Sequence, residues 1–195
     1  MIWSSIEKMP NAIVLGASTG GINALGFLFS KLGEDFSLPI LVTKHIGLND
    51  DSGVLRVLSR QSTLPIKVAK DKHRIQPGVI YLAPSGYHML VEARGVVSLN
   101  LEAPVAYSRP SIDVLFQSAA RVYQQDLVAV ILTGANWDGA DGIRTVKDFG
   151  GTTVVQCPIN AEMSVMPKAS LDTGCVDYLM TLEAISAFLD QIGSA

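Results

Sequence analysis

Residues 12–33 read AIVLGASTGGINALGFLFSKLG, and this stretch decides the fold class. The apolar run at 12–15 predicts a short buried strand that ends at Gly16. Apolar positions then recur at roughly helical spacing over residues 22–32, and Gly33 is expected to stop that helix. A strand, a glycine-rich turn and a helix in this order form the repeating unit of an α/β sheet.

The same alternation continues along the chain. Further apolar runs predict strands at 39–42, 66–69, 79–83, 127–132, 153–156 and 176–179, with helices at 48–58, from 111 onward, up to 149, at 167–173 and at 182–192. The runs 88–92 and 96–101 flank Arg94-Gly95 and predict a β-hairpin. Ser111 is placed to cap the helix that follows it. The pattern predicts a three-layer α/β/α fold, with a mostly parallel, doubly wound sheet and a β-hairpin.

Composition limits the possible classes of protein. With 195 residues, 48% of them hydrophobic, the chain can bury one sizeable core but has no room for a second full domain. The formal net charge is −3, and no basic run interleaved with aromatic residues is visible, so nucleic acid is not an expected partner.

The sequence also indicates the cellular compartment of the chain. Polar Ser4, Glu7 and Lys8 stand where a secretory signal would place its apolar stretch. The apolar runs fall far short of the roughly 18 residues that suggest a membrane span, so no membrane insertion is expected. With only two cysteines, the chain is expected in the cytoplasm with both reduced. No His, Cys and carboxylate cluster at metal-ligand spacing appears, so no metal is expected.

Three polar residues stand where predicted strands end. Ser18 follows the first strand, His45 follows the second, and Asp138 lies in the loop after the strand at 127–132. Because the carboxyl ends of parallel strands meet at one edge of the sheet, we expect these side chains to lie close together. A serine hydroxyl becomes nucleophilic when an imidazole accepts its proton and a carboxylate orients that imidazole. We therefore predict Ser18 as nucleophile, His45 as general base and Asp138 as the residue that orients the base.

Each of the three also has a simpler interpretation. The glycine-rich turn around Ser18 suits the phosphate of a nucleotide, although a Walker lysine and the full Gly-x-Gly-x-x-Gly spacing are missing. His45 alone reads as a structural histidine, and Asp138 stands in the position of a helix cap. Nucleotide binding, and a non-catalytic signalling or scaffold module on the same fold, therefore stay open as alternatives.

Four segments carry a resemblance to a known family. They are LGASTGG at 15–21, RPSIDVLF at 109–116, LTG at 132–134 and MPKA at 166–169. In this order and spacing they resemble the chemotaxis protein-glutamate methylesterases of the CheB type, and the similarity runs from residue 13 to 179. The chain order Ser, His, Asp also differs from the Ser, Asp, His order of the α/β-hydrolases, which indicates a different scaffold.

The resemblance implies the roles just given for Ser18, His45 and Asp138. It further implies a supporting role for Thr19 and an oxyanion donor in the backbone N–H of Ala135. The implied reaction is hydrolysis of glutamate γ-methyl esters in the cytoplasmic helices of methyl-accepting chemotaxis receptors, through an acyl-enzyme. Deamidation of glutamine would follow the same route, and neither reaction needs a metal or an organic cofactor.

The sequence departs from the family pattern at several positions. Lys44 replaces the common Gln before the histidine, and Ala135-Asn136 replaces Met-Gly. A backbone donor survives a side-chain change, so the oxyanion role of Ala135 is unaffected. Lys44 and Trp137 are expected to alter the substrate groove. His88 lies in a matching segment and is a candidate for lying near the substrate, with a structural turn as the alternative.

Family members commonly carry an N-terminal receiver domain that covers the active site. This chain enters its first strand at Ala12, whereas a receiver domain needs on the order of 100 residues. We expect a single catalytic domain over 1–195 without a receiver domain, and a site that stands open.

Overall fold

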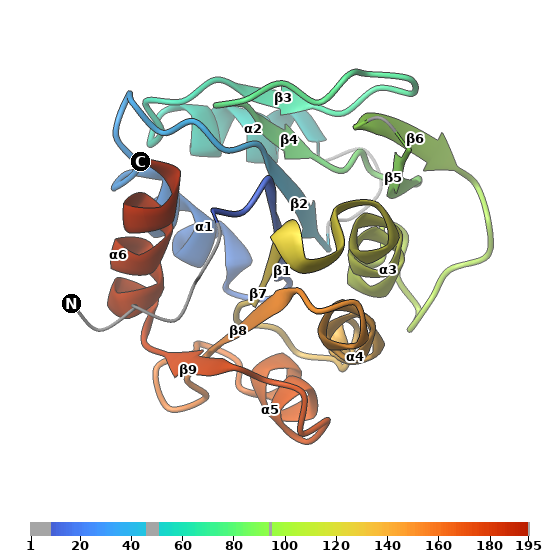
Figure 1. Ribbon diagram of the computed structural model, residues 1–195, viewed down its shortest axis with the longest axis vertical. Coiled ribbons are helices and arrows are strands. Elements are labelled where there is room, and N and C mark those ends of the chain that lie inside the picture. Colours follow the sequence, from blue (N-terminus) through green and yellow to red (C-terminus); the bar gives the residue numbers. More distant parts are fainter. Residues whose placement is uncertain (1–8, 46–50, 94, 195) are drawn as a thin grey trace.

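The computed structural model describes residues 9–45, 51–93 and 95–194, and within them the chain folds into three layers (Figure 1). The middle layer is a sheet in the order β3-β4-β2-β1-β7-β8-β9, and every neighbouring pair in it is parallel. β5 and β6 form a separate antiparallel hairpin. The predicted α/β/α class, with a doubly wound sheet and a hairpin, is confirmed.

The strands are β1 Ala12–Ala17, β2 Ile40–Lys44, β3 Ile66–Val68, β4 Ile80–Leu82, β5 His88–Glu92, β6 Val96–Asn100, β7 Leu127–Ile131, β8 Thr152–Gln156 and β9 Tyr178–Met180. The helices are α1 Gly21–Phe29, α2 Asp51–Ser59, α3 Ile112–Tyr123, α4 Ala140–Asp148, α5 Val165–Leu171 and α6 Leu182–Gly193, and a short 3₁₀ turn, Gln124–Asp126, precedes β7. None of the helices in the described ranges is long and apolar enough to span a membrane.

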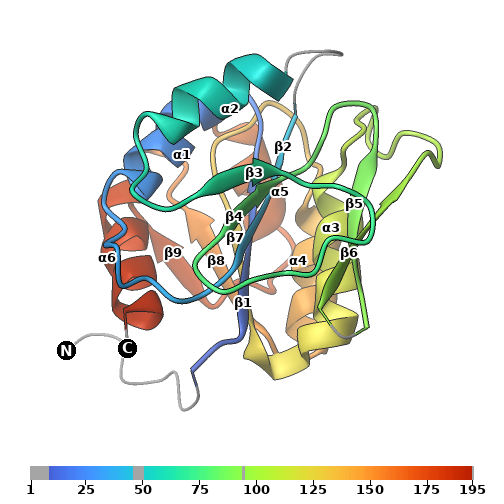
Figure 2. The same ribbon diagram turned by 90° about the horizontal axis from the view of Figure 1, so that it is seen from above.

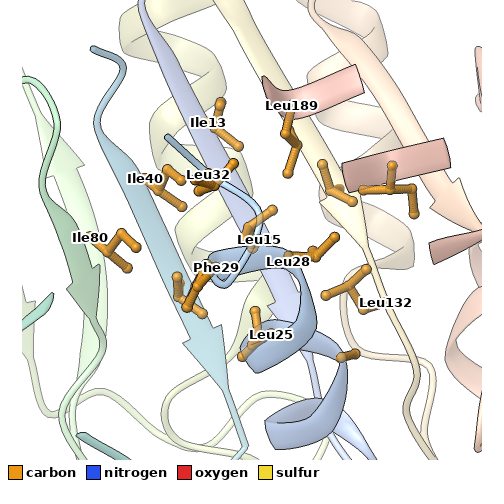
Figure 3. Close-up of a cluster of buried hydrophobic side chains, with 14 of the residues drawn as sticks. Ile13, Leu15, Leu25, Leu28, Phe29, Leu32, Ile40, Ile80, Leu132 and Leu189 are labelled. Atoms are coloured by element: carbon orange, nitrogen blue, oxygen red, sulfur yellow. The ribbon is translucent and has the colours of Figure 1, made fainter. Parts of the chain in front are cut away.

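Alternate residues of β1 point into two different cores. Ile13 and Leu15 face the layer formed by α1, α2 and α6, whereas Ala12 and Val14 face α3, α4 and the β5–β6 hairpin. Figure 2 shows the sheet between these two layers, and Figure 3 shows the first core, with α1 packed on the strands. Because both faces are covered, β1 is buried along its whole length and reads as a continuous apolar run.

Two predicted boundaries near the site differ from the structure. β1 continues to Ala17 and does not stop at Gly16. A β-carbon at Gly16 would lie 2.5 Å from Cγ2 of Ile112. This glycine therefore lets α3 pack closely on the strand. α1 ends at Phe29, yet Leu32 is only 2% exposed, so the apolar spacing up to residue 32 reports burial beyond the helix end.

The remaining differences are small. α5 begins at Val165, two residues before the predicted start, which places Pro167 inside its first turn. β9 is displaced toward the C-terminus by one or two residues from the predicted 176–179. The helix predicted at 48–58 is present from Asp51, while 48–50 and the hairpin residue Arg94 lie outside the described residues.

Leu15→Ala is expected to lower the free energy of unfolding by about 3 to 5 kcal/mol, because this side chain is fully buried in the central strand and its loss leaves a cavity. Urea unfolding measures the change. Leu179→Ala is the matched control, since Leu179 is 53% exposed on the edge strand β9, and it should cost less than about 1 kcal/mol. Equal losses at the two positions would contradict the assignment of Leu15 to the core.

The sheet opens a crevice at the carboxyl end of β1. β1 lies between β2 and β7, and its chain continues into α1 on one face, whereas β7 continues into α4 on the other. Where successive connections leave a parallel sheet toward opposite faces, the loops separate and ligands bind between them. Ser18 stands directly after β1, and the loop 132–139 stands directly after β7.

Candidate active site

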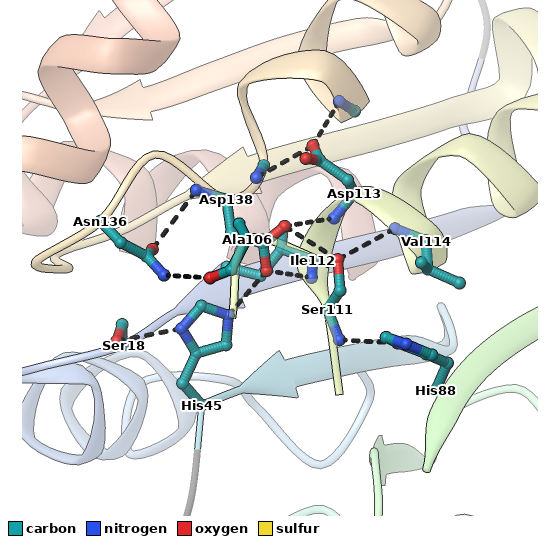
Figure 4. A network of polar contacts seen from close by, with 12 residues as sticks. Ser18, His45, His88, Ala106, Ser111, Ile112, Asp113, Val114, Asn136 and Asp138 are labelled. Carbon is teal, nitrogen blue, oxygen red and sulfur yellow. Dashed lines mark hydrogen bonds and ion pairs between the residues drawn. The ribbon is translucent and has the colours of Figure 1, made fainter. Parts of the chain in front are cut away.

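The Ser18, His45 and Asp138 side chains form a hydrogen-bonded chain at this crevice (Figure 4). Nδ1 of His45 lies 3.2 Å from Oγ of Ser18, and Nε2 of His45 lies 2.7 Å from Oδ2 of Asp138. Because a carboxylate only accepts, the neutral ring carries its proton on Nε2 and presents the Nδ1 lone pair to the serine hydroxyl. The ring nitrogens have exchanged the places they take in serine proteases, where Nε2 faces the serine.

Asp138 is held in place by the beginning of α3. Its Oδ1 accepts hydrogen bonds from Oγ of Ser111 at 2.8 Å and from the N–H of Asp113 at 3.1 Å, and Oδ2 also accepts from the N–H of Ile112 at 2.7 Å. The carboxylate thus satisfies N–H groups that an isolated helix leaves without partners. The interpretation of Asp138 as the cap of its own helix is wrong, since the N-cap residue of α4 is Gly139, which has no side chain to supply a cap.

These contacts decide the charge of Asp138. Its side chain is fully buried, and burial alone would raise the pKa of the carboxyl. Hydrogen bonds from the His45 ring and from the N–H groups of Ile112 and Asp113 outweigh burial, so the pKa of Asp138 lies below its usual value. Because the pKa of Asp138 is lower in the folded chain than in the unfolded chain, the ionised carboxylate stabilises the fold at pH values above the ordinary aspartate pKa. This stabilisation is lost as the pH falls through the lowered pKa. At neutral pH Asp138 is therefore an anion facing the ring.

An open cleft of about 370 Å³ lies over Ser18 and His45. Its walls are the glycine turn and first residues of α1 together with two charged side chains, Lys44 and Glu162. Lys44, which the sequence predicted to alter the substrate groove, lines the cleft. Its Nζ donates to the carbonyl oxygen of His45 at 2.8 Å. Glu162 comes from the segment after β8 and was not predicted.

The turn that carries Ser18 needs glycine at Gly20. This residue has a φ of 78°, and a β-carbon there would lie 2.8 Å from the Glu162 side chain. The turn leads straight into α1, and the first residues of this helix, 21–23, line the cleft. The N–H groups at the beginning of a helix carry no hydrogen bond within the helix. A partial positive charge is thus available close to Ser18.

The two residues predicted to support the nucleophile, Thr19 and Ala135, lie in different loops, one after β1 and one after β7. Thr19 lines the cleft, and its carbonyl oxygen accepts from Oγ1 of Thr133 at 2.9 Å. The N–H of Ser18 donates to the carbonyl of Thr133, also at 2.9 Å. Ala135 is exposed at the bend after β7, and its N–H makes no backbone hydrogen bond to another described residue. Thr133 therefore ties the nucleophile turn to the loop that carries Ala135 and Asp138.

His88 and Trp137 lie away from the cleft walls. The His88 ring is fully buried behind the site, where Nδ1 accepts from the N–H of Ser111 at 3.1 Å and Nε2 donates to the carbonyl of Ala103 at 3.1 Å. His88 supports α3, and its contacts match the structural alternative. Trp137 is 56% exposed and packs edge-on against Tyr107, with ring centroids 6.4 Å apart.

Three residues that contact the triad or its supports were not predicted for this role. Ser111 was predicted only as a helix cap; its Oγ accepts from the N–H of Val114 and also donates to Asp138. Asn136 accepts from the N–H of Asp138 at 3.3 Å and donates to the carbonyl of Ala106 at 3.4 Å. Asp113 lies in the RPSIDVLF segment that carries the family resemblance, but no role was predicted for it, although its carboxyl is buried beside the site.

In the part of the chain that the structure describes, no three His, Cys, Asp or Glu side chains lie close enough together to hold a metal ion. The arrangement presents a hydroxyl, an imidazole and a buried carboxylate in line beside an open cleft. Chemically, it is suited to transferring the proton of Ser18 while its oxygen attacks an electrophile.

Known proteins resemble this chain over most of its length. The family model for the CheB methylesterase matches residues 13–189. A curated relative from Leptospira interrogans is 43% identical over 183 residues, which cover 92% of this chain and 95% of the relative. A Clostridium acetobutylicum protein named protein-glutamate methylesterase/protein-glutamine glutaminase is 34% identical, but the matching part covers 90% of this chain and only 51% of that protein.

A solved structure gives the same result. The Thermotoga maritima CheB methylesterase catalytic domain superposes with a TM-score of 0.90 at 31% sequence identity, covering 94% of this chain and 98% of that domain. The match thus extends over nearly the whole chain. This chain belongs to the CheB methylesterase family.

Proposed function

We propose that this chain hydrolyses glutamate γ-methyl esters on methyl-accepting chemotaxis receptors, and deamidates glutamine by the same route. The observation that carries the proposal is the hydrogen-bonded chain from Ser18 through His45 to the buried Asp138, beside an open cleft. Family membership and the name of the Clostridium relative support the choice of substrate.

In the first half of the reaction, Oγ of Ser18 attacks the γ-carbonyl carbon of the ester while Nδ1 of His45 takes the hydroxyl proton. The Nε2–H keeps its hydrogen bond to the carboxylate of Asp138, which stabilises the imidazolium so formed. Nδ1–H then protonates the methoxy oxygen, the C–O bond breaks and methanol leaves. Ser18 is left as a glutamyl ester.

In the second half, water attacks the acyl carbon while Nδ1 of His45 takes one of its protons. The bond to Ser18 breaks, Nδ1 returns the proton to Oγ, and the γ-carboxyl group of glutamate is released and loses its remaining proton to water. With glutamine as substrate, ammonia leaves in place of methanol.

The developing oxyanion requires donors near Ser18. We assign this role to the exposed N–H of Ala135, with Thr19 and the first N–H groups of α1 in support. Lys44 and Glu162 place opposite charges on the cleft walls and are assigned to substrate selection. Trp137, exposed in the loop that leads to Asp138, is assigned to contact with the receptor outside the cleft.

No metal or organic cofactor takes part in this reaction scheme, since each proton moves between the substrate, Ser18, His45 and water. We propose a cytoplasmic location for the chain, because the proposed substrate is a cytoplasmic receptor helix that carries methyl esters. We assign the described residues to one catalytic domain.

The direct test is release of methanol. Purified chain is incubated with methylated receptor in membranes, and methanol is measured against time with unmethylated receptor as the blank. A serine-reactive phosphonate probe distinguishes the non-catalytic alternative, because a scaffold module would not react at Ser18. Absence of both methanol release and probe labelling would refute the proposal.

Activity is expected to rise with pH, because only the neutral imidazole of His45 can accept the Ser18 proton. Histidine side chains generally change charge between about pH 5 and 8, so kcat/KM is measured over this range. Asp138 contributes no step there, because its lowered pKa keeps it ionised throughout. His73→Gln, which changes a histidine away from the cleft, should leave the profile unchanged; a flat wild-type profile would indicate another base.

A further inference from the structure

The Asp113 side chain forms hydrogen bonds with a helix other than its own. It lies in the first turn of α3 and is only 6% exposed. Its Oδ1 accepts hydrogen bonds from the N–H of Gly139 at 2.9 Å and from the N–H of Gly142 at 2.6 Å. Both donors belong to the beginning of α4, whose N-cap residue supplies no side-chain cap. Asp113 therefore caps α4 from α3.

The relation between the two helices is reciprocal. Asp138, in the turn that leads into α4, accepts hydrogen bonds from Ser111, Ile112 and the N–H of Asp113 at the beginning of α3. Each helix thus supplies the carboxyl group that binds the N-terminus of the other (Figure 4). The pair fixes the segment that carries Asp138 from both sides.

Gly142 allows the two helices to come this close. A β-carbon at that position would lie 2.7 Å from Cβ of Phe116 and 3.2 Å from Oδ1 of Asp113. Because glycine has only a hydrogen atom in place of a side chain, the N–H of Gly142 can reach the Asp113 carboxyl. The short contact depends on the close packing of α3 on α4, and it places the Asp113 carboxyl next to that of Asp138.

The two buried carboxyls divide the charge unequally. Burial, together with the negative charges of Asp138 and Asp141, raises the pKa of Asp113 to about 7 against the opposing hydrogen bond from Gly142. The pKa of Asp138, by contrast, is lowered. The negative charge is therefore concentrated on Asp138, the carboxyl that faces His45.

We propose that Asp113 is a positioning residue for ester hydrolysis, which holds Gly139 and Gly142 so that Oδ2 of Asp138 meets Nε2 of His45. This inference rests on the proposed function for its kinetic consequence only. Asp113 touches neither the cleft nor the reacting atoms, so its loss should affect kcat and leave KM nearly unchanged.

The test compares Asp113→Ala with Asp113→Asn in the full chain. Alanine removes the acceptor for both N–H groups, and we expect kcat to fall by about 10- to 100-fold, the scale of an ångström-sized misplacement, with KM within about twofold. Asparagine keeps an acceptor oxygen at the same place and should retain kcat within about threefold. Asp141→Ala is the matched control, because it removes an exposed carboxylate from the same first turn of α4, where Asp141 pairs with Arg144.

A second measurement does not depend on turnover. In protein labelled with ¹⁵N at histidine, the ring nitrogen shifts of His45 report the Nε2–H tautomer. We expect this tautomer in the wild type, Asp113→Asn and Asp141→Ala, and a mixture of tautomers in Asp113→Ala. Should Asp113→Ala not fold, Gly142→Ala tests the same contact from the other side, since its methyl group presses on Phe116 and stretches the hydrogen bond to Asp113; the same mixture and a several-fold loss of kcat are expected.

Two results would overturn the inference. One is an Asp113→Ala protein, or its Gly142→Ala substitute, with wild-type kcat and an unchanged His45 tautomer. The other is equal loss in folded Asp113→Ala and Asp113→Asn, which would show that the carboxylate charge matters and the hydrogen-bond acceptor does not. If the wild type releases no methanol from methylated receptor, the proposed function fails, and the tautomer measurement still decides the role of Asp113.

Discussion

Ser18→Ala is expected to reduce kcat for methanol release by roughly 10⁶-fold, the scale of loss when a serine triad loses its nucleophile. The substitution removes the hydroxyl that lies 3.2 Å from Nδ1 of His45 and leaves the backbone of the turn unchanged. Ser18 is partly exposed, so the free energy of unfolding should change by less than about 1 kcal/mol. Methanol release and urea unfolding are measured on the same preparation.

The matched control is Ser30→Ala. Ser30 stands at the opposite end of α1, where its Oγ donates to the carbonyl of Phe27 at 2.8 Å, and it lies far along the helix from the cleft. Wild-type turnover is expected for this variant. Methanol release by Ser18→Ala at more than about one hundredth of the wild-type rate would show that Ser18 is not the nucleophile.

Asp138→Asn should lower kcat by roughly 10³ to 10⁴, the effect of mistuning the base in a triad. The two carboxylate oxygens accept from four donors: Ser111 and Asp113 at Oδ1, and Ile112 and His45 at Oδ2. An amide group replaces one oxygen by a donor, so two of these donors lose their acceptor. If His45 is one of them, the Nε2–H tautomer loses its hydrogen-bond acceptor. Otherwise, donors at the beginning of α3 are left without an acceptor.

The same change is expected to cost about 1 to 3 kcal/mol of unfolding free energy, because a buried donor without an acceptor is unfavourable. Asp148→Asn, which alters an exposed carboxylate at the other end of α4, is the control and should leave both quantities near wild type. A loss of kcat below about tenfold would leave Asp138 with a structural role only, as the cap of α3.

The sequence was most informative about strands and about the residues that follow them. Strands buried on both faces appear as continuous apolar runs, so β1, β2 and β7 could be located without a structure. In a parallel sheet, the residues after the strands come to one edge, and this rule was sufficient to select Ser18 and His45. Both selections depend on local pattern alone.

Helix and strand ends were less certain for a physical reason. Apolar spacing reports burial, and Leu32 is buried although α1 has already ended. A glycine is likewise needed for different reasons at different positions. Gly16 makes room for Ile112 within β1, whereas Gly20 takes up a positive φ in a turn. The sequence shows the residue type but not which of these causes applies.

The sequence by itself predicted the fold class, located the strands that lead into the site and selected Ser18, His45 and Asp138 as the candidate set. Only the tertiary structure decided that β1 lies between β2 and β7, that Nδ1 of His45 faces Ser18, and that Asp138 and Asp113 cap each other's helices. The reason is the range of the interactions. Periodicity and turn chemistry act between neighbours in the chain, whereas Asp113 and Gly139 are 26 residues apart, and they meet only because two helices pack on the same face of the sheet.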